Sequence, residues 1–140
     1  MRLLLVDPDP ALVAEGLAGD GMLDLRHVAA LADTEVRAFA PDLIVIACDS
    51  PDRDTIESLR ESTANNPRPV VMFVDRSEPG LGEEAIRAGV AAYIVDGLHP
   101  TRVRPILEVA MSRFQLMQSL RADLAKAQTE FSWAKNHRAR

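Results

Sequence analysis

The segment Pro41-Asp42-Leu43-Ile44-Val45-Ile46-Ala47-Cys48-Asp49-Ser50-Pro51 decides the fold, because it joins a continuous apolar run to a polar loop. Residues 43–46 are apolar at every position, so both faces of a strand built from them would be buried. Strands of this kind lie at the centre of parallel sheets that are covered on both sides by helices. The segment therefore predicts a central strand whose carboxyl end opens into a loop.

Four further apolar runs flank this strand, at residues 3–6, 23–28, 70–74 and 91–95. The run at 23–28 alternates apolar and charged residues, which favours a half-exposed strand near one edge. Helical patterns separate the runs, at residues 11–18, 33–40, 54–65, 83–88 and from Pro100 onward. This alternation predicts βαβ units and a doubly wound α/β fold. The expected fold is flavodoxin-like, with a five-stranded parallel sheet in the order 2-1-3-4-5.

Composition limits the classes of protein that the sequence can encode. Its 140 residues suit one domain with an appendage, and aromatic residues make up only 4%, so the core should be aliphatic. The net charge of −5 gives no indication of a nucleic-acid surface. Cys48 is the only cysteine, which excludes an internal disulfide and suits a reducing compartment, and we interpret it as a small apolar residue at a strand end. The apolar runs are too short for a signal peptide or a membrane span, so we expect a cytoplasmic location and no membrane partner.

The last helix is too long for such a domain. From Thr101 to about residue 135 we expect no interruption, a length of roughly 50 Å. The domain needs only the first three turns, so we predict a globular domain over 1–112 and a coiled-coil extension over 113–140. Apolar residues alternate at spacings of three and four beyond the domain, and these are Met117, Leu120, Leu124, Ala127, Phe131 and Ala134. A heptad pattern of this kind predicts a homodimer through a parallel coiled coil, while folding back onto the domain is the alternative.

Five segments in order carry a likeness to a known family: Arg2-Leu3-Leu4-Leu5-Val6-Asp7, Pro41-Asp42-Leu43-Ile44-Val45-Ile46, Asp49-Ser50-Pro51-Asp52-Arg53-Asp54, Pro69-Val70-Val71-Met72-Phe73, and Ala88-Gly89-Val90-Ala91-Ala92-Tyr93-Ile94-Val95. Across residues 1 to about 112 the chain resembles response-regulator receiver domains, and most of all those of AmiR/NasT-type antitermination regulators. In that group a coiled coil and a three-helix RNA-binding ANTAR module follow the receiver. The basic tail at 133–140 is too short for this module, so we expect no nucleic-acid partner for this chain alone.

The resemblance also identifies the positions that perform receiver chemistry. Receivers bind Mg²⁺ through two acids after the first strand and through the phosphate-accepting aspartate after the third. A hydroxyl residue and a lysine after the fourth and fifth strands contact the phosphoryl oxygens. Here Asp7 matches the first acid, but the other four positions hold residues that depart from the pattern, namely Pro8, Ala47, Val74 and Asp96. We therefore expect a degenerate phosphorylation site in a regulatory domain that is not an enzyme. We expect this domain to act through dimerisation and through contacts with other proteins, among them a sensor or regulatory protein.

The sequence leaves alternatives open for the phosphate acceptor, for a metal ion and for Tyr93. Asp49, two residues beyond Ala47, or Asp7 would be the acceptor of a phosphorylatable response regulator. Asp7, Asp9 and Asp49 would hold a metal ion weakly, and Mg²⁺ is the one cofactor that the resemblance leaves open. Tyr93 is either a switching aromatic, as in receivers, or part of the core.

A small enzyme on a flavodoxin-like fold is a further interpretation, and few features of the sequence support it. No glycine-rich phosphate loop follows a strand, and His27, His99 and His137 are scattered.

Overall fold

The computed structural model of the protein describes residues 1–19, 21–64 and 66–138, with side chains up to residue 134. Its five strands form one parallel sheet in the order β2-β1-β3-β4-β5, which confirms the predicted fold. Strands and helices alternate along the chain as β1 (Arg2–Val6), α1 (Ala11–Gly16), β2 (Asp24–Val28), α2 (Asp33–Phe39), β3 (Leu43–Cys48), α3 (Arg53–Ala64), β4 (Val70–Val74), α4 (Leu81–Arg87), β5 (Ala92–Val95) and α5 (Pro100–Arg138).

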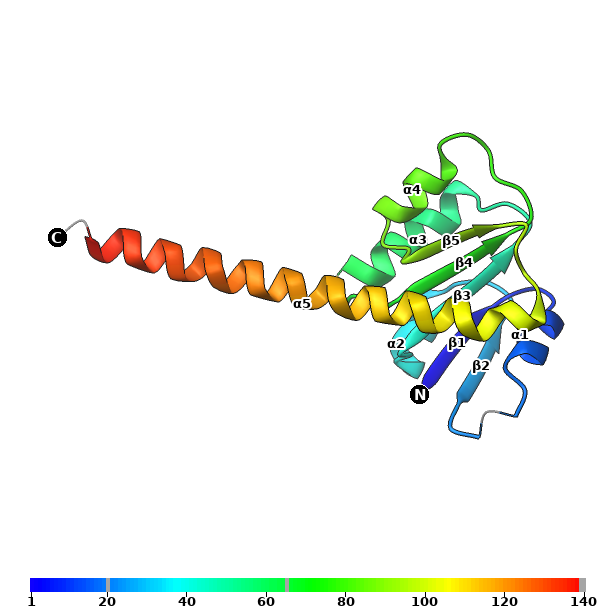
Figure 1. Ribbon diagram of the computed structural model, residues 1–140. Helices are drawn as coiled ribbons and strands as arrows, with labels where there is room; N and C mark the ends of the chain where they lie inside the picture. The colour runs from blue at the N-terminus through cyan, green and yellow to red at the C-terminus, as the bar shows by residue number, and fades with distance from the viewer. Residues whose placement is uncertain (20, 65, 139–140) are drawn as a thin grey trace.

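Two apolar clusters lie on opposite faces of the sheet. Helices α1 and α5 cover one face, and α2, α3 and α4 lie on the other (Figure 1). Successive side chains of a strand point to opposite faces of the sheet. Ile44 and Ile46 therefore belong to the cluster on the face of α2, α3 and α4, and Val45 belongs to the cluster on the face of α1 and α5. This double burial explains why β1, β3 and β4 are apolar without alternation. β2 forms the predicted edge strand, and its first four residues are exposed.

Gly16 marks the closest approach of α1 to α5. A Cβ atom at Gly16 would lie 2.5 Å from the carbonyl oxygen of Pro100 and 2.9 Å from the Cβ of Val103. No side chain fits at that distance, so the crossing of these two helices requires glycine. The helix α1 also ends there, two residues earlier than the pattern at 11–18 predicts.

Helix α5 contains 39 residues, a length of roughly 58 Å, and its second half projects beyond the domain (Figure 1). The expectation of an uninterrupted helix overlooked Pro105, which lies inside it. Proline has no N–H to donate to the carbonyl of Thr101, yet the helix continues through this position. Val103, Leu107 and Ala110 are buried against the domain, whereas Leu124 and Phe131 are exposed.

Contact between α5 and the domain reaches beyond residue 112, because Phe114 and Gln118 are half-buried. Of the basic tail at 133–140, the side chains after residue 134 and the whole of residues 139 and 140 lie outside the described part of the chain. In the part that is described, no helix has the length and apolar character needed to cross a membrane.

Candidate functional site

The candidate site lies at the carboxyl edge of the sheet, where β1, β3, β4 and β5 end. Asp7 directly follows β1, Ala47 lies at the end of β3, and Asp96 directly follows β5. The strand register places Ala47 beside Phe73 and pairs Val74 with Cys48 and with Val95. The structure therefore brings the positions predicted from sequence to one edge, with Pro8 exposed next to Asp7.

Ala47, which the resemblance to receivers predicts at the acceptor position, is part of the core. It is 5% exposed and belongs to the same apolar cluster as Leu5 and Phe73. Val74, predicted at the hydroxyl position, is 2% exposed and belongs to the cluster on the opposite face. Neither side chain has an oxygen atom, so these two positions offer neither a nucleophile nor a hydrogen bond to a phosphoryl group.

Asp7, predicted to match the first acid of the receiver pattern, is only 6% exposed. Its Oδ1 accepts a hydrogen bond of 2.8 Å from the backbone N–H of Asp9. Burial raises the pKa of the Asp7 carboxyl above its ordinary value, and the negative charges of Asp9 and Asp75 raise it further. The hydrogen bond from the Asp9 N–H and the neighbouring His27 act in the opposite direction and lower this pKa. A desolvated carboxylate surrounded by like charges is costly to ionise.

Asp49, the alternative acceptor, is held by a residue that sequence reasoning missed. The guanidinium of Arg76 contacts it through Nη2 and Oδ2 at 2.6 Å and through Nε and Oδ1 at 3.3 Å. Backbone N–H groups of Asp75 and Arg76 both donate to the Asp49 carbonyl at 2.9 Å. The hydrogen bond that Arg76 donates to Asp49, together with the negative charge of this carboxylate, raises the pKa of Arg76, so this cation stays charged. Arg76 is the second residue after β4, which pairs with β3, and that placement was the only available signal.

The three carboxylates proposed as metal ligands do not form a cluster. Over residues 1–19, 21–64 and 66–138, no group of three or more His, Cys, Asp or Glu side chains is arranged to hold a metal ion. Asp7 and Asp9 accept backbone N–H groups, the latter from Ala11 at 3.4 Å, and Asp49 contacts Arg76. The geometry therefore adds no support to the metal prediction. Asp96, predicted at the lysine position, is exposed with a φ of 50°, and its backbone N–H donates to the carbonyl of Val74 at 2.8 Å.

Cys48 reports the electrostatic character of this edge. Burial, followed by the charges of Asp75, Asp52 and Asp49, raises the pKa of its thiol to about 11. The thiol is therefore protonated at neutral pH, which makes it a poor nucleophile. The same carboxylates repel an approaching phosphate group, and the charge of Arg76 already faces Asp49.

Tyr93 on β5 connects the sheet to the loop between β4 and α4. Its hydroxyl donates a hydrogen bond of 2.9 Å to the Oγ of Ser77, and its ring lies 3.4 Å from the Cβ position of Gly82. The side chain is only half-buried. This arrangement ties the aromatic ring to a loop and leaves both of its predicted roles open.

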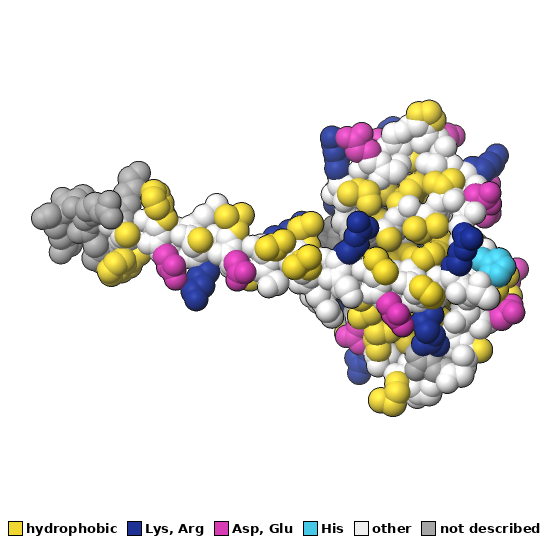
Figure 2. Space-filling model, viewed as in Figure 1, with side chains coloured by type: hydrophobic (Ala, Val, Ile, Leu, Met, Phe, Trp, Pro, Cys, Tyr) yellow, Lys and Arg dark blue, Asp and Glu magenta, His cyan; other side chains and the backbone are white. Residues whose placement is uncertain are grey.

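The predicted dimerisation residues lie on the projecting half of α5. Exposed fractions are 52% for Met117, 55% for Leu120, 59% for Leu124 and 71% for Phe131, and Ala127 is also exposed. Hydrophobic side chains recur along this part of the helix in Figure 2. Met117 and Leu120 lie beside the domain, whereas Leu124 and Phe131 are mostly exposed, so the prediction that the whole extension folds back onto the domain finds no support in this arrangement.

The fold defined by these elements is that of CheY-like receiver domains. The structure matches a receiver of a LuxO repressor protein from Vibrio parahaemolyticus with a TM-score of 0.68 and 20% identity, covering 85% of this chain and 95% of that one. It matches a CheY-like receiver from Methanospirillum hungatei with a TM-score of 0.66 and 19% identity, covering 83% and 97%. At such identities the likeness establishes the fold.

The sequence itself is similar to the transcriptional regulatory protein PdtaR of Mycobacterium tuberculosis. The two are 31% identical over 110 residues, which cover 79% of this chain and 50% of the relative. The chain thus spans about half the length of the curated relatives that it matches. No protein-family model matches the sequence.

Proposed function

We propose that this chain is a receiver-type regulatory domain of a two-component-like signalling system that has lost phosphorylation at the acceptor position. One observation carries the proposal: Ala47 stands where receivers place the acceptor aspartate, and its methyl group is buried in the core. Phosphoryl transfer to a receiver requires a carboxylate nucleophile and a metal that neutralises the incoming charge. Ala47 and Val74 supply no oxygen atoms for this chemistry.

The alternative proposal keeps phosphorylation and assigns it to Asp49. The adjacent Arg76 would favour it by attracting an anionic phosphoryl donor. However, Asp49 would have to leave a two-point contact with that guanidinium, and Asp75 and Asp52 stand nearby. We therefore keep Asp49 as the second candidate.

Signalling without phosphate would proceed through association of two copies. Six apolar layers between Met117 and Ala134 suit a two-stranded coiled coil. An antiparallel pairing that keeps all six layers would set Asp123 against Glu130 of the second helix, and like charges repel. A parallel pairing avoids this contact and places both domains at the same end.

The similarity to PdtaR supports a role in transcriptional regulation, with the AmiR/NasT-type group as the proposed subfamily. In this proposal the chain performs the regulatory part of such a protein, contacts a sensor or regulatory protein, and has no enzymatic activity. RNA binding would require a module other than the residues present here.

Intact mass after incubation with acetyl phosphate and Mg²⁺ tests the proposal. The parent chain should gain no phosphoryl group, and the Ala47→Asp variant serves as the comparison with a restored nucleophile. If the parent gains a phosphoryl group, the proposal fails, and Asp49→Asn then decides between Asp49 and Asp7. A gain by Ala47→Asp alone identifies Ala47 as the residue that silenced the site.

A further inference from the structure

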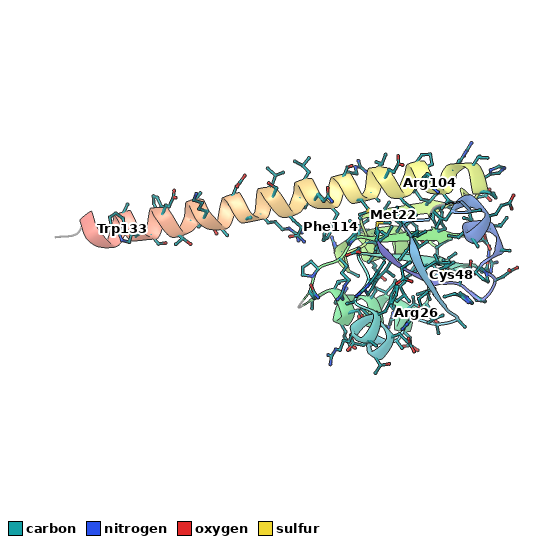
Figure 3. All side chains as sticks on the ribbon, turned by 90° about the horizontal axis from the view of Figure 1, so that it is seen from below. Met22, Arg26, Cys48, Arg104, Phe114 and Trp133 are labelled. Carbon is teal, nitrogen blue, oxygen red and sulfur yellow. The ribbon has the colours of Figure 1, made fainter. Side chains whose placement is uncertain are left out.

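A groove of about 660 Å³ lies where α5 leaves the domain, at the end of the sheet opposite to the candidate site. One wall comes from the segments that precede β4 and β5, including Pro67, Arg68 and Ile86. The other wall comes from α5, including Phe114, which lies on the domain side of the helix in Figure 3. The groove therefore spans the junction between the globular domain and the projecting helix.

The lining combines apolar side chains with unbalanced positive charge. Its apolar part includes Pro67, Ile86, Phe114, Leu116, Met117 and Leu120. Three arginines line the same groove, Arg68, Arg113 and Arg121, and no Asp or Glu is among the lining residues. This is unusual for a chain whose net charge is −5.

The charges of these arginines are not neutralised within the described chain. None of the three forms an ion pair or a side-chain hydrogen bond with a described residue. Arg68 is half-buried as a residue, whereas Arg113 and Arg121 are exposed. An anion placed among these guanidinium groups would form charge-assisted hydrogen bonds with them.

We propose that this groove binds a small molecule with an apolar body and an anionic group, such as a carboxylate or a sulfonate. The volume lies within the range of about 300–1,000 Å³ that is typical of small-molecule sites. The apolar residues would cover the body of the ligand, and guanidinium groups from both walls would contact its charge.

Binding there would connect the domain to its helix. The ligand would contact Arg68 and Ile86 on the domain and Arg113 and Arg121 on α5 at the same time. It would favour whichever direction of α5 closes the groove around it, and an equilibrium shifts only through such differential contact. This regulatory consequence rests on the proposed function, whereas binding itself does not.

Fluorescence titration of the full chain with anilinonaphthalene sulfonate, an apolar anion, tests the site. Its uncharged parent compound, phenylnaphthylamine, is the matched probe for the apolar contribution. We expect the Arg113→Gln/Arg121→Gln variant to bind the sulfonate at least about tenfold more weakly, because the two guanidinium groups that α5 offers to the anionic group are lost. Binding of the uncharged probe should change little. Arg102→Gln, which alters an exposed arginine of α5 outside the groove, should leave both titrations unchanged.

The apolar wall is tested by Ile86→Glu, which places a carboxylate at a half-exposed position without opening the core. Binding of the sulfonate should be lost, while Leu12→Glu, at a similarly exposed position on α1, should retain it. Unchanged binding in the double arginine variant, or in Ile86→Glu, overturns the proposal. The mass in solution of each variant is recorded separately, so a monomeric chain that still shows the arginine dependence refutes dimerisation and leaves this site intact.

Discussion

Apolar side chains are buried at the carboxyl edge of the sheet and exposed to solvent along the projecting half of α5. At the edge, Ala47 and Val74, which we match to polar positions of receivers, are 5% and 2% exposed. Along the helix, Leu124 and Phe131 stand in contact with solvent, at 59% and 71% exposed. The first region buries its apolar groups within the chain. The second leaves apolar area uncovered, which favours association because burial of that area lowers the free energy.

The largest effect should come from placing charges at the exposed apolar positions of α5 that form the predicted coiled-coil seam. In Leu120→Glu/Leu124→Glu, two carboxylates would enter consecutive apolar layers, where burial of an unpaired charge is costly. We expect the mass in solution, measured by light scattering, to fall from that of a dimer to that of a monomer. The domain should stay folded, because both positions are exposed.

The control for that variant places the same charges elsewhere on the helix. Ser119→Glu/Ala122→Glu alters exposed positions turned away from the seam, and it should remain dimeric. A dimer that survives the Leu120/Leu124 change contradicts the coiled-coil proposal, and so does a parent chain that is monomeric at the same concentration.

Removal of the Asp7 charge should produce a smaller, pH-dependent gain in stability. The pKa of Asp7 is raised in the fold from its ordinary value of 3.8, so the unfolded chain loses this proton first as pH rises. Ionisation of Asp7 therefore lowers the stability of the fold above pH 3.8 and has no such effect below it. Asp7→Asn keeps an oxygen acceptor for the Asp9 N–H and should raise the melting temperature by a few degrees at pH 7, with the gain vanishing toward pH 3.

Thermal unfolding at several pH values checks this expectation, with Asp24→Asn, at an exposed position of β2, as the control. An Asp7→Asn variant that is less stable at pH 7 would show that the carboxylate charge supports the edge. In that case the burial and repulsion described for Asp7 would not be the dominant effects.

The smallest expected effect concerns the exposed ion pair between Arg76 and Asp49. In Arg76→Gln the melting temperature should hardly change, because solvent-exposed ion pairs contribute little. The backbone amides of Asp75 and Arg76 should exchange hydrogen faster, since the side-chain contact that fastens their loop is gone. Hydrogen exchange measured by mass spectrometry on this loop decides the matter, with Arg60→Gln as a control at a distant exposed pair. Unchanged exchange would mean that backbone hydrogen bonds alone hold the loop.

The strands were predictable from sequence because burial on both faces imposes a continuous apolar run on β1, β3 and β4. The edge position of β2 followed from its alternation for the same reason. Element ends were less predictable, as α1 shows: the close packing of α5 on Gly16 is a tertiary contact that no local pattern reveals. The helix α5 continues through Pro105, because the packing of Val103 and Leu107 compensates for the loss of one backbone hydrogen bond. A local pattern does not reveal this compensation.

At the candidate site, the sequence indicated which positions would meet but not what the side chains would do there. The order of the strands was enough to bring Asp7, Ala47 and Asp96 to one edge. The contact between Arg76 and Asp49 depends on where a long, flexible side chain points from a loop, and periodicity carries no information on that. The groove beside α5 could not be predicted either, because its two walls come from residues 63–91 and 113–121, which only the tertiary structure brings together.

The glycine at the crossing of α1 and α5 has a mechanical consequence. From Val103, which lies at the crossing with Gly16, the helix extends roughly 46 Å to Ala134, so it forms a lever arm about this crossing. A tilt of about 10° there would move Ala134 by about 8 Å, which exceeds the rise of one helical turn. A single methyl group at residue 16 would force the base of the lever to shift, and the displacement would be amplified along the chain to whatever the far end engages.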